Sequence, residues 1–222
     1  SEGFRDREHT IENPDGKIRV AVVGDSWIFG TGSLQKDNIT SALQRVLDEE
    51  GTAPAGYEVF NFGVPGLNLE GMVKVARGFA LAYKPDIIVF SFICDDLSTT
   101  DTISHFGWYS LFPQSKKRQP WVEYIDRELL VRYKMWRYQF DMRLMQKFPS
   151  LYEKRVAILV DYFRELAVEA SAEIAVVRYC TSPVMDGVVR KHNEAHDKKI
   201  HIVPHPEVET FSNHYHPNKA GS

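Results

Sequence analysis

The sequence predicts a three-layer α/β/α domain built around a parallel sheet of about five strands. The first observation is a run of β-branched and small apolar residues from Ile18 to Gly24, with almost no polar break, typical of a strand buried on both faces. The second is the alternation of such runs with helical segments, in the order β-α-β-α-β. The third is size, because 222 residues that are 43% hydrophobic suit one large core. We therefore expect a single domain over 1–222.

The first half of the chain supplies three expected strands and two expected helices. A polar arm over 1–17 carries a Pro-Asp-Gly turn signal and leads into the first strand. Asn38 offers an N-cap for the first helix, which Gly51 ends, and Pro85 closes the second helix. The expected elements are a strand over 17–24, a helix over 39–50, a strand over 57–62, a helix over 69–83 and a strand over 86–92.

The second half begins with a segment that breaks the alternation. Residues 98–120 mix small, charged and aromatic side chains, and we expect a long loop there that borders the ligand crevice. Pro149 divides the helical segment that follows. Pro217 suits the first turn of a helix, so a C-terminal helix that the chain does not reach is a further expectation. The expected elements are helices over 121–147 and 151–170, a strand over 173–178, a helix over 187–198 and a strand over 200–204.

Composition argues against several classes of function. The net charge is -3 and the pI is about 6.2, so nucleic acid is not an expected partner. Cys94 and Cys180 lack C-x-x-C spacing, and the histidines are scattered, so we expect no disulfide framework, no metal site and no cofactor. No apolar run is long enough to span a membrane, and no signal peptide is recognisable. These features predict a soluble domain, either cytoplasmic or extracytoplasmic after removal of an N-terminal segment.

Residues suited to acyl-transfer chemistry follow the expected strands at their carboxyl ends. Ser26 comes directly after the first strand, Gly63 after the second and Asp95 after the third, and His216 lies beyond the fifth. Open α/β sheets hold their ligands at this end of the strands. A serine hydroxyl becomes a useful nucleophile when a neutral histidine accepts its proton. Taken alone, Gly-Asp-Ser at 24–26 fits an ordinary turn as well as a nucleophile.

Four sequence blocks together resemble the SGNH (GDSL) hydrolase family. They occur in the family's order and at its usual spacing, and they span nearly the whole chain. The blocks are Gly-Asp-Ser at 24–26, Asn-Phe-Gly-Val-Pro-Gly at 61–66, Asp-Asp-Leu at 95–97 and His-Pro-Asn-Lys-Ala-Gly at 216–221. The resemblance implies a flavodoxin-like parallel sheet and an activity on ester bonds that needs neither a metal nor another cofactor.

The resemblance also implies a role for each matching residue. Ser26 corresponds to the nucleophile and, through its backbone N–H, to one oxyanion donor. Gly63 corresponds to a second backbone donor, and His216 to the general base. Two positions depart from the family. Asp95 stands where an asparagine side chain donates to the oxyanion, and Asn213 stands where an aspartate orients the histidine. An ionised Asp95 can only accept hydrogen bonds, and Asn213 brings no charge to stabilise an imidazolium.

Two functional hypotheses follow. The first is a serine ester hydrolase or O-acyl transferase that acts through an acyl-Ser26 intermediate, with His216 as base. Its partner would be a small-molecule ester, including a glycan or lipid ester. The alternative is a catalytically impaired protein of the same fold that binds an ester or glycan ligand. The departures at Asp95 and Asn213 are the reason to keep it.

Overall fold

The computed structural model describes residues 3–92, 136, 139–140, 143–144, 147–179, 183–197 and 199–203. Within these ranges, five strands form one sheet in the order β2-β1-β3-β4-β5. Every pair is parallel, so the predicted sheet is confirmed. The strands are β1 (Ile18–Gly24), β2 (Tyr57–Gly63), β3 (Ile87–Phe92), β4 (Glu173–Arg178) and β5 (Ile200–Val203).

The helices begin where the sequence places capping residues. The side chain of Asn38 accepts a hydrogen bond from the backbone N–H of Ser41, and that of Asn68 accepts one from Gly71. Gly51 ends its helix in the left-handed conformation, with φ of +59°. The helices are α1 (Ser26–Phe29), α2 (Ile39–Glu50), α3 (Leu69–Gly78), α7 (Pro149–Ala170) and α8 (Pro183–Ala195), with 3-10 turns η1 (Gln35–Asp37) and η2 (Ala80–Tyr83).

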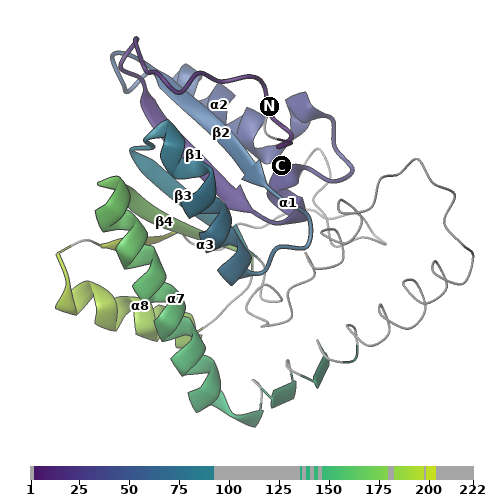
Figure 1. Cartoon of the computed structure of the whole chain (residues 1–222), viewed down its shortest axis with the longest axis vertical. Helices are drawn as coiled ribbons and strands as arrows, with labels where there is room; N and C mark the ends of the chain where they lie inside the picture. Colours follow the sequence, from purple (N-terminus) through teal and green to yellow (C-terminus); the bar gives the residue numbers. More distant parts are fainter. Residues whose placement is uncertain are drawn as a thin grey trace, which may run out of the picture.

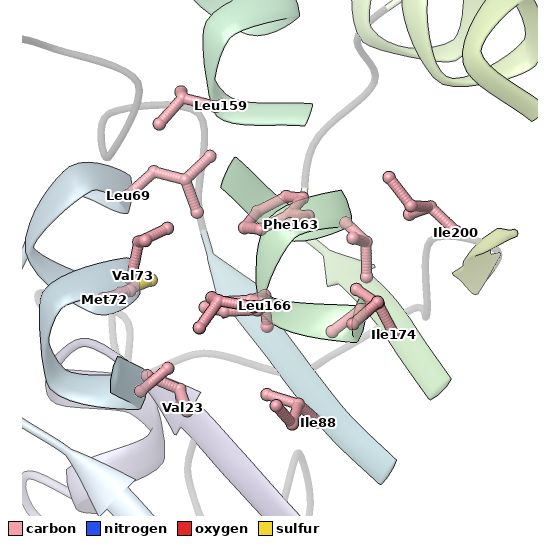
Figure 2. Close-up of a cluster of buried hydrophobic side chains, with 14 of the residues drawn as sticks. Val23, Leu69, Met72, Val73, Ile88, Leu159, Phe163, Leu166, Ile174 and Ile200 are labelled. Carbon is pink, nitrogen blue, oxygen red and sulfur yellow. The ribbon is translucent and has the colours of Figure 1, made fainter. Parts of the chain in front are cut away.

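The sheet lies between two layers of helices, as predicted. α3 and α7 lie on one face of the sheet and α2 on the other (Figure 1). Alternate residues of β1 explain this, because Ala21 and Val23 join the α3–α7–α8 side while Val20 and Val22 join the α2 side. Figure 2 shows the larger core, in which side chains of α3 and α7 meet those of the strands. Its labelled members are Val23, Leu69, Met72, Val73, Ile88, Leu159, Phe163, Leu166, Ile174 and Ile200.

Several expected boundaries differ from the structure, by one residue at the strands over 17–24, 57–62 and 86–92 and by more elsewhere. The last helix covers 183–195 rather than 187–198, because Pro183 suits a first turn better than Gly187 does. The long helix begins at Pro149, for the same reason, rather than at 151. The segment over 69–83 breaks at Phe79 into α3 and a 3-10 turn. The last strand ends at Val203. The loop over 98–120 and most of the helix over 121–147 fall outside the described residues.

The N-terminal arm (residues 3–13) lies along β2, which is one of the two edge strands of the sheet that the described residues form. The Phe4 ring packs edge-on against Phe62 at 5.0 Å and Phe79 at 5.2 Å between ring centroids. The carboxylate of Asp6 accepts a hydrogen bond from the backbone N–H of Asn61 at 2.6 Å. The sequence predicted a polar lead-in to the first strand, whereas these residues are an integral part of the packing.

The side chain of Gln44, on α2, also reaches the outer edge of β2. Its amide oxygen accepts a hydrogen bond from the backbone N–H of Val59 at 2.9 Å. Its amide nitrogen donates to the backbone carbonyl of Tyr57 at 3.1 Å. Together with Asp6, it gives partners to outward-facing backbone groups of β2, which have no neighbouring strand on that side among the described residues.

A buried ionic network joins the arm to the sheet. Arg19 is 1% exposed, and its Nε donates to Glu58 at 3.0 Å. Glu58 also contacts His9, whose Nδ1 lies 2.9 Å from the carboxylate, while the His9 Nε2 lies 3.1 Å from Asp6. The remaining guanidinium N–H groups donate to backbone carbonyls at 2.7–2.9 Å, namely those of Thr10, Ile11, Glu12 and Tyr83.

His9 is expected to make the stability of the fold depend on pH. Burial lowers the pKa of His9, but the carboxylates of Asp6 and Glu58 outweigh burial and raise the pKa above 6.5. The charged imidazolium therefore stabilises the folded state fully below pH 6.5, and this contribution is lost as the pH rises through the raised folded-state pKa. Urea unfolding of the protein and of His9→Gln should show a stability difference that is largest below pH 6.5 and shrinks above it.

His201→Gln is the matched control for this measurement. His201 also lies beside a carboxylate, with Nε2 3.2 Å from Glu173, but its side chain is 59% exposed. An exposed pair contributes little, so this variant should follow the wild-type curve at every pH. A constant stability difference between wild type and His9→Gln from pH 5 to 9 would contradict the assignment of the pH dependence to His9.

Candidate active site

Ser26 is the first residue of α1, two residues beyond the carboxyl end of β1, an interior strand between β2 and β3. Asp25 caps this short helix, because its Oδ1 accepts a hydrogen bond from the backbone N–H of Trp27 at 2.9 Å. The Ser26 Oγ lies 3.4 Å from the other carboxylate oxygen of Asp25, which is longer than an ordinary hydroxyl–oxygen hydrogen bond. Asp25 is 5% exposed, so the side chain that caps α1 is itself buried. We refer to α1 and the residues that flank it, 25–33, as the serine turn.

Two glycines allow α1 to lie directly against the strand ends. A Cβ on Gly63 would stand 2.1 Å from the backbone nitrogen of Phe29 and 2.5 Å from the carbonyl carbon of Ile28. A Cβ on Gly24 would stand 2.3 Å from the Ile28 side chain and 2.8 Å from the backbone oxygen of Ser91. All four distances are too short for real side chains, so only glycine permits this approach at either position. The Gly-Asp-Ser and Asn-Phe-Gly blocks are therefore packed against each other.

Asn61 connects β2 to α1 from inside the protein. It is 1% exposed, and its Nδ2 donates to the Ile28 carbonyl at 2.8 Å and to the Thr40 hydroxyl at 3.1 Å. Its Oδ1 accepts a hydrogen bond from the backbone N–H of Gly63 at 2.9 Å. The N–H assigned to an oxyanion by the sequence resemblance thus already has an acceptor, and an oxyanion would have to share or replace that bond.

Tyr179 is a neighbour of the serine turn that the sequence analysis missed. It follows β4, and its ring lies 4.5 Å from that of Trp27 between centroids. Burial raises the pKa of the Tyr179 phenol, the neighbouring Ser91 side chain opposes this, and the Asp25 carboxylate acts in the same direction as burial. The phenol therefore stays neutral beside the buried carboxylate. The sequence around Tyr179 gives no sign of this contact, because the contact joins the segments that follow β1 and β4, which are far apart in the chain.

The structure brings together two of the five site residues expected from the sequence. Ser26 and Gly63 lie on either side of the close contact between α1 and β2. Asp95, Asn213 and His216 lie outside the described residues, as do Cys94 and Cys180. Among the residues that are described, no group of His, Cys, Asp or Glu side chains is arranged to hold a metal ion. In the same part of the chain, no helix has the length and apolar character needed to cross a membrane.

Comparison with known proteins finds likeness at the level of structure. No protein-family profile and no curated protein sequence matches the chain. TesA matches over 91% of this chain and 90% of its own, with 15% identity and a TM-score of 0.50. AlinE4, described as an SGNH-hydrolase family esterase, matches over 93% and 89%, with 15% identity and a TM-score of 0.50. The esterase EstA from Pseudoalteromonas sp. matches over 91% and 89%, with 13% identity and a TM-score of 0.51.

The chain has the SGNH-hydrolase fold. The likeness extends over about nine-tenths of both chains in each of these comparisons. In this fold, the Gly-Asp-Ser block stands at the carboxyl end of the interior strand β1, and open α/β sheets bind their ligands at this end of the strands.

Proposed function

We propose that the protein is a serine ester hydrolase that forms an acyl-Ser26 intermediate. The observation that carries the proposal is the place of Ser26 on α1, at the end of β1 and packed against Gly63, in a chain with the SGNH fold. AlinE4 and EstA, whose folds resemble this one, are described as esterases. The substrate is a small-molecule ester, with glycan and lipid esters among the candidates.

The proposed reaction uses a hydroxyl, a base and backbone donors. Ser26 Oγ attacks the ester carbonyl carbon while His216 takes its proton. The tetrahedral oxyanion accepts hydrogen bonds from the backbone N–H groups of Ser26 and Gly63. As the carbonyl reforms, the bond to the alcohol breaks and His216 returns the proton to the leaving oxygen. Water then attacks the acyl-serine in the same manner, and an acceptor alcohol in place of water would make the protein an O-acyl transferase.

A ligand-binding protein without turnover is the second candidate. Asp95 and Asn213 favour it, because neither supplies what the corresponding family residue supplies. The hydrogen bond from Gly63 N–H to Asn61 Oδ1 favours it as well, because it occupies one proposed oxyanion donor. In this candidate the same crevice holds an ester or glycan, and Ser26 contributes a hydroxyl contact only.

Labelling with a fluorophosphonate is the experiment that separates the two candidates. EstA is described as inhibited by monoethylphosphonate, so the reagent class suits this fold. The hydrolase should be labelled at Ser26, as mapped by peptide mass spectrometry, and should cleave at least one member of a p-nitrophenyl ester series of increasing acyl length. Ser26→Ala should remove both the labelling and the ester cleavage without unfolding the protein, since a partly exposed hydroxyl adds little to the core.

Two results of the same experiment would count against the ester hydrolase. A folded protein that is neither labelled nor active on any ester of the series would favour the binding protein. Ester cleavage that persists in purified Ser26→Ala would contradict the acyl-serine intermediate itself, whatever the substrate.

A further inference from the structure

The side chain of Arg5, on the N-terminal arm, binds the turn that carries Ser26. Its guanidinium donates to the backbone carbonyls of Gly30 and Ser33 and lies 3.4 Å from that of Phe29. It also lies over the Phe29 ring, 5.6 Å from the ring centroid. These carbonyls stand at and beyond the carboxyl end of α1, where a positive charge is favourable. One planar guanidinium therefore contacts backbone carbonyls at the end of α1 and in the turn that follows it.

The next residue of the arm, Asp6, is linked through Asn61 to the second proposed site residue, Gly63. Asp6 accepts the backbone N–H of Asn61, and the side chain of Asn61 in turn accepts the N–H of Gly63 and donates to the Ile28 carbonyl. Arg5 and Asp6 thus contact the serine turn and β2, the two segments whose relative position would have to be kept for catalysis. His9 anchors the arm from its other end through Glu58.

Helix α1 has little stability of its own, which is why an external contact matters. It has four residues, and a single hydrogen-bonded turn is unfavourable in isolation. Its backbone bonds include those from the N–H of Gly30 to the Trp27 carbonyl at 3.1 Å and from Thr31 to the Ser26 carbonyl at 3.0 Å. Gly30 has φ of +77°, and a Cβ there would stand 3.4 Å from the Arg5 Nη1. The turn and the guanidinium are therefore closely fitted.

We propose that Arg5 is a positioning residue for catalysis, which holds the α1 turn so that Ser26 and Gly63 keep the geometry needed for acyl transfer. The proposal rests on the proposed ester hydrolase function. It assigns to the N-terminal arm a part in the reaction that acts through the α1 turn. Small displacements of a reacting group can cost about 100-fold in rate, so a loosened turn should lower kcat more than it changes KM.

Arg5→Gln is the test, with Arg7→Gln as the matched control. Arg7 lies on the same arm, but it is exposed and its guanidinium donates to Gln44 on α2 rather than to the serine turn. We expect Arg5→Gln to lower kcat on the best p-nitrophenyl ester at least tenfold, with KM within twofold, and Arg7→Gln to leave both unchanged. Arg5→Lys should fall between, because an ammonium keeps the charge but is a compact group without the planar, widely spaced N–H groups of the guanidinium.

Hydrogen–deuterium exchange supplies a readout independent of turnover. The peptide over 26–33 should exchange faster in Arg5→Gln than in wild type and in Arg7→Gln. An unchanged kcat in folded Arg5→Gln, or an equal loss in Arg7→Gln, would overturn the proposal. If Arg5→Gln does not fold, an Arg5→Lys variant with wild-type kcat would overturn it. A wild-type protein that is neither active nor labelled at Ser26 is instead a failure of the proposed function, and equal exchange rates would then overturn the role of Arg5 as well.

Discussion

Replacing Arg19 with methionine is expected to lower the free energy of unfolding by about 3–5 kcal/mol. Methionine fills part of the volume but donates no hydrogen bonds. The change leaves the Glu58 carboxylate, 16% exposed, without the guanidinium at 3.0 Å, and it removes the donor from four backbone carbonyls. Removing one partner of a buried ion pair costs more than the pair itself contributes, because the other charge stays in the protein. Urea unfolding followed by circular dichroism measures the loss.

Arg77→Met is the matched control for this change. Arg77 also pairs with carboxylates, those of Glu165 and Glu169 at 3.4 and 3.2 Å, but its side chain is 43% exposed. Exposed pairs contribute at most about 1 kcal/mol, so the control should unfold close to wild type. Equal losses in the free energy of unfolding for the two variants would contradict the prediction, because the Arg19 network would then contribute no more than an exposed ion pair.

Gly63→Ala is expected to destabilise the fold by about 3 kcal/mol and to abolish labelling at Ser26. The added methyl group would overlap the backbone of α1, at 2.1 Å from the Phe29 nitrogen. A backbone cannot rotate away as a flexible side chain can, so α1 has to move as a unit. The displacement would separate Ser26 from the end of β2 and disturb the Asn61 bond to the Gly63 N–H. Thermal unfolding and fluorophosphonate labelling, measured on the same sample, report the two effects.

Gly78→Ala provides the comparison for the same chemical change. Gly78 is the last residue of α3, and a Cβ there meets nothing within 4 Å. Alanine in a helix is favoured over glycine by about 0.5–1 kcal/mol, so this variant should be as stable as wild type or slightly more stable. A Gly63→Ala protein with wild-type stability and labelling would mean that α1 is not fixed against β2.

The layered fold was predictable because each element carries its own periodic signal. The strand over 173–178 and the helix that begins after Asn38 match the sequence prediction, since a buried apolar run and a capping side chain act locally. Gly187 misled the prediction of the last helix, because a glycine in a helix interior looks like a boundary. Pro183 was the better signal, since its missing N–H has no role in a first turn.

Only those residues of the candidate site that belong to sequence motifs were predictable. The Gly-Asp-Ser block at the end of a strand located Ser26, and a short glycine motif located Gly63. The contacts of Arg5 and Tyr179 were not predictable, because each joins segments that are distant in sequence and leaves no periodic trace. A phenylalanine beside charged residues in the arm, at Phe4, was the one available hint that the arm is packed.

The side chains that cover the outer edge of β2 also bear on self-association. An exposed edge strand offers unpaired N–H and C=O groups to any second chain, and natural proteins protect such edges against aggregation. Here Asp6 and Gln44 occupy the groups that an incoming strand would need, at Asn61, Val59 and Tyr57. The arm that contacts the turn after α1 through Arg5 therefore also covers one backbone group of this edge through Asp6. A chain shortened by its first nine residues would lose both of these contacts, whereas Gln44 on α2 would still cover Val59 and Tyr57.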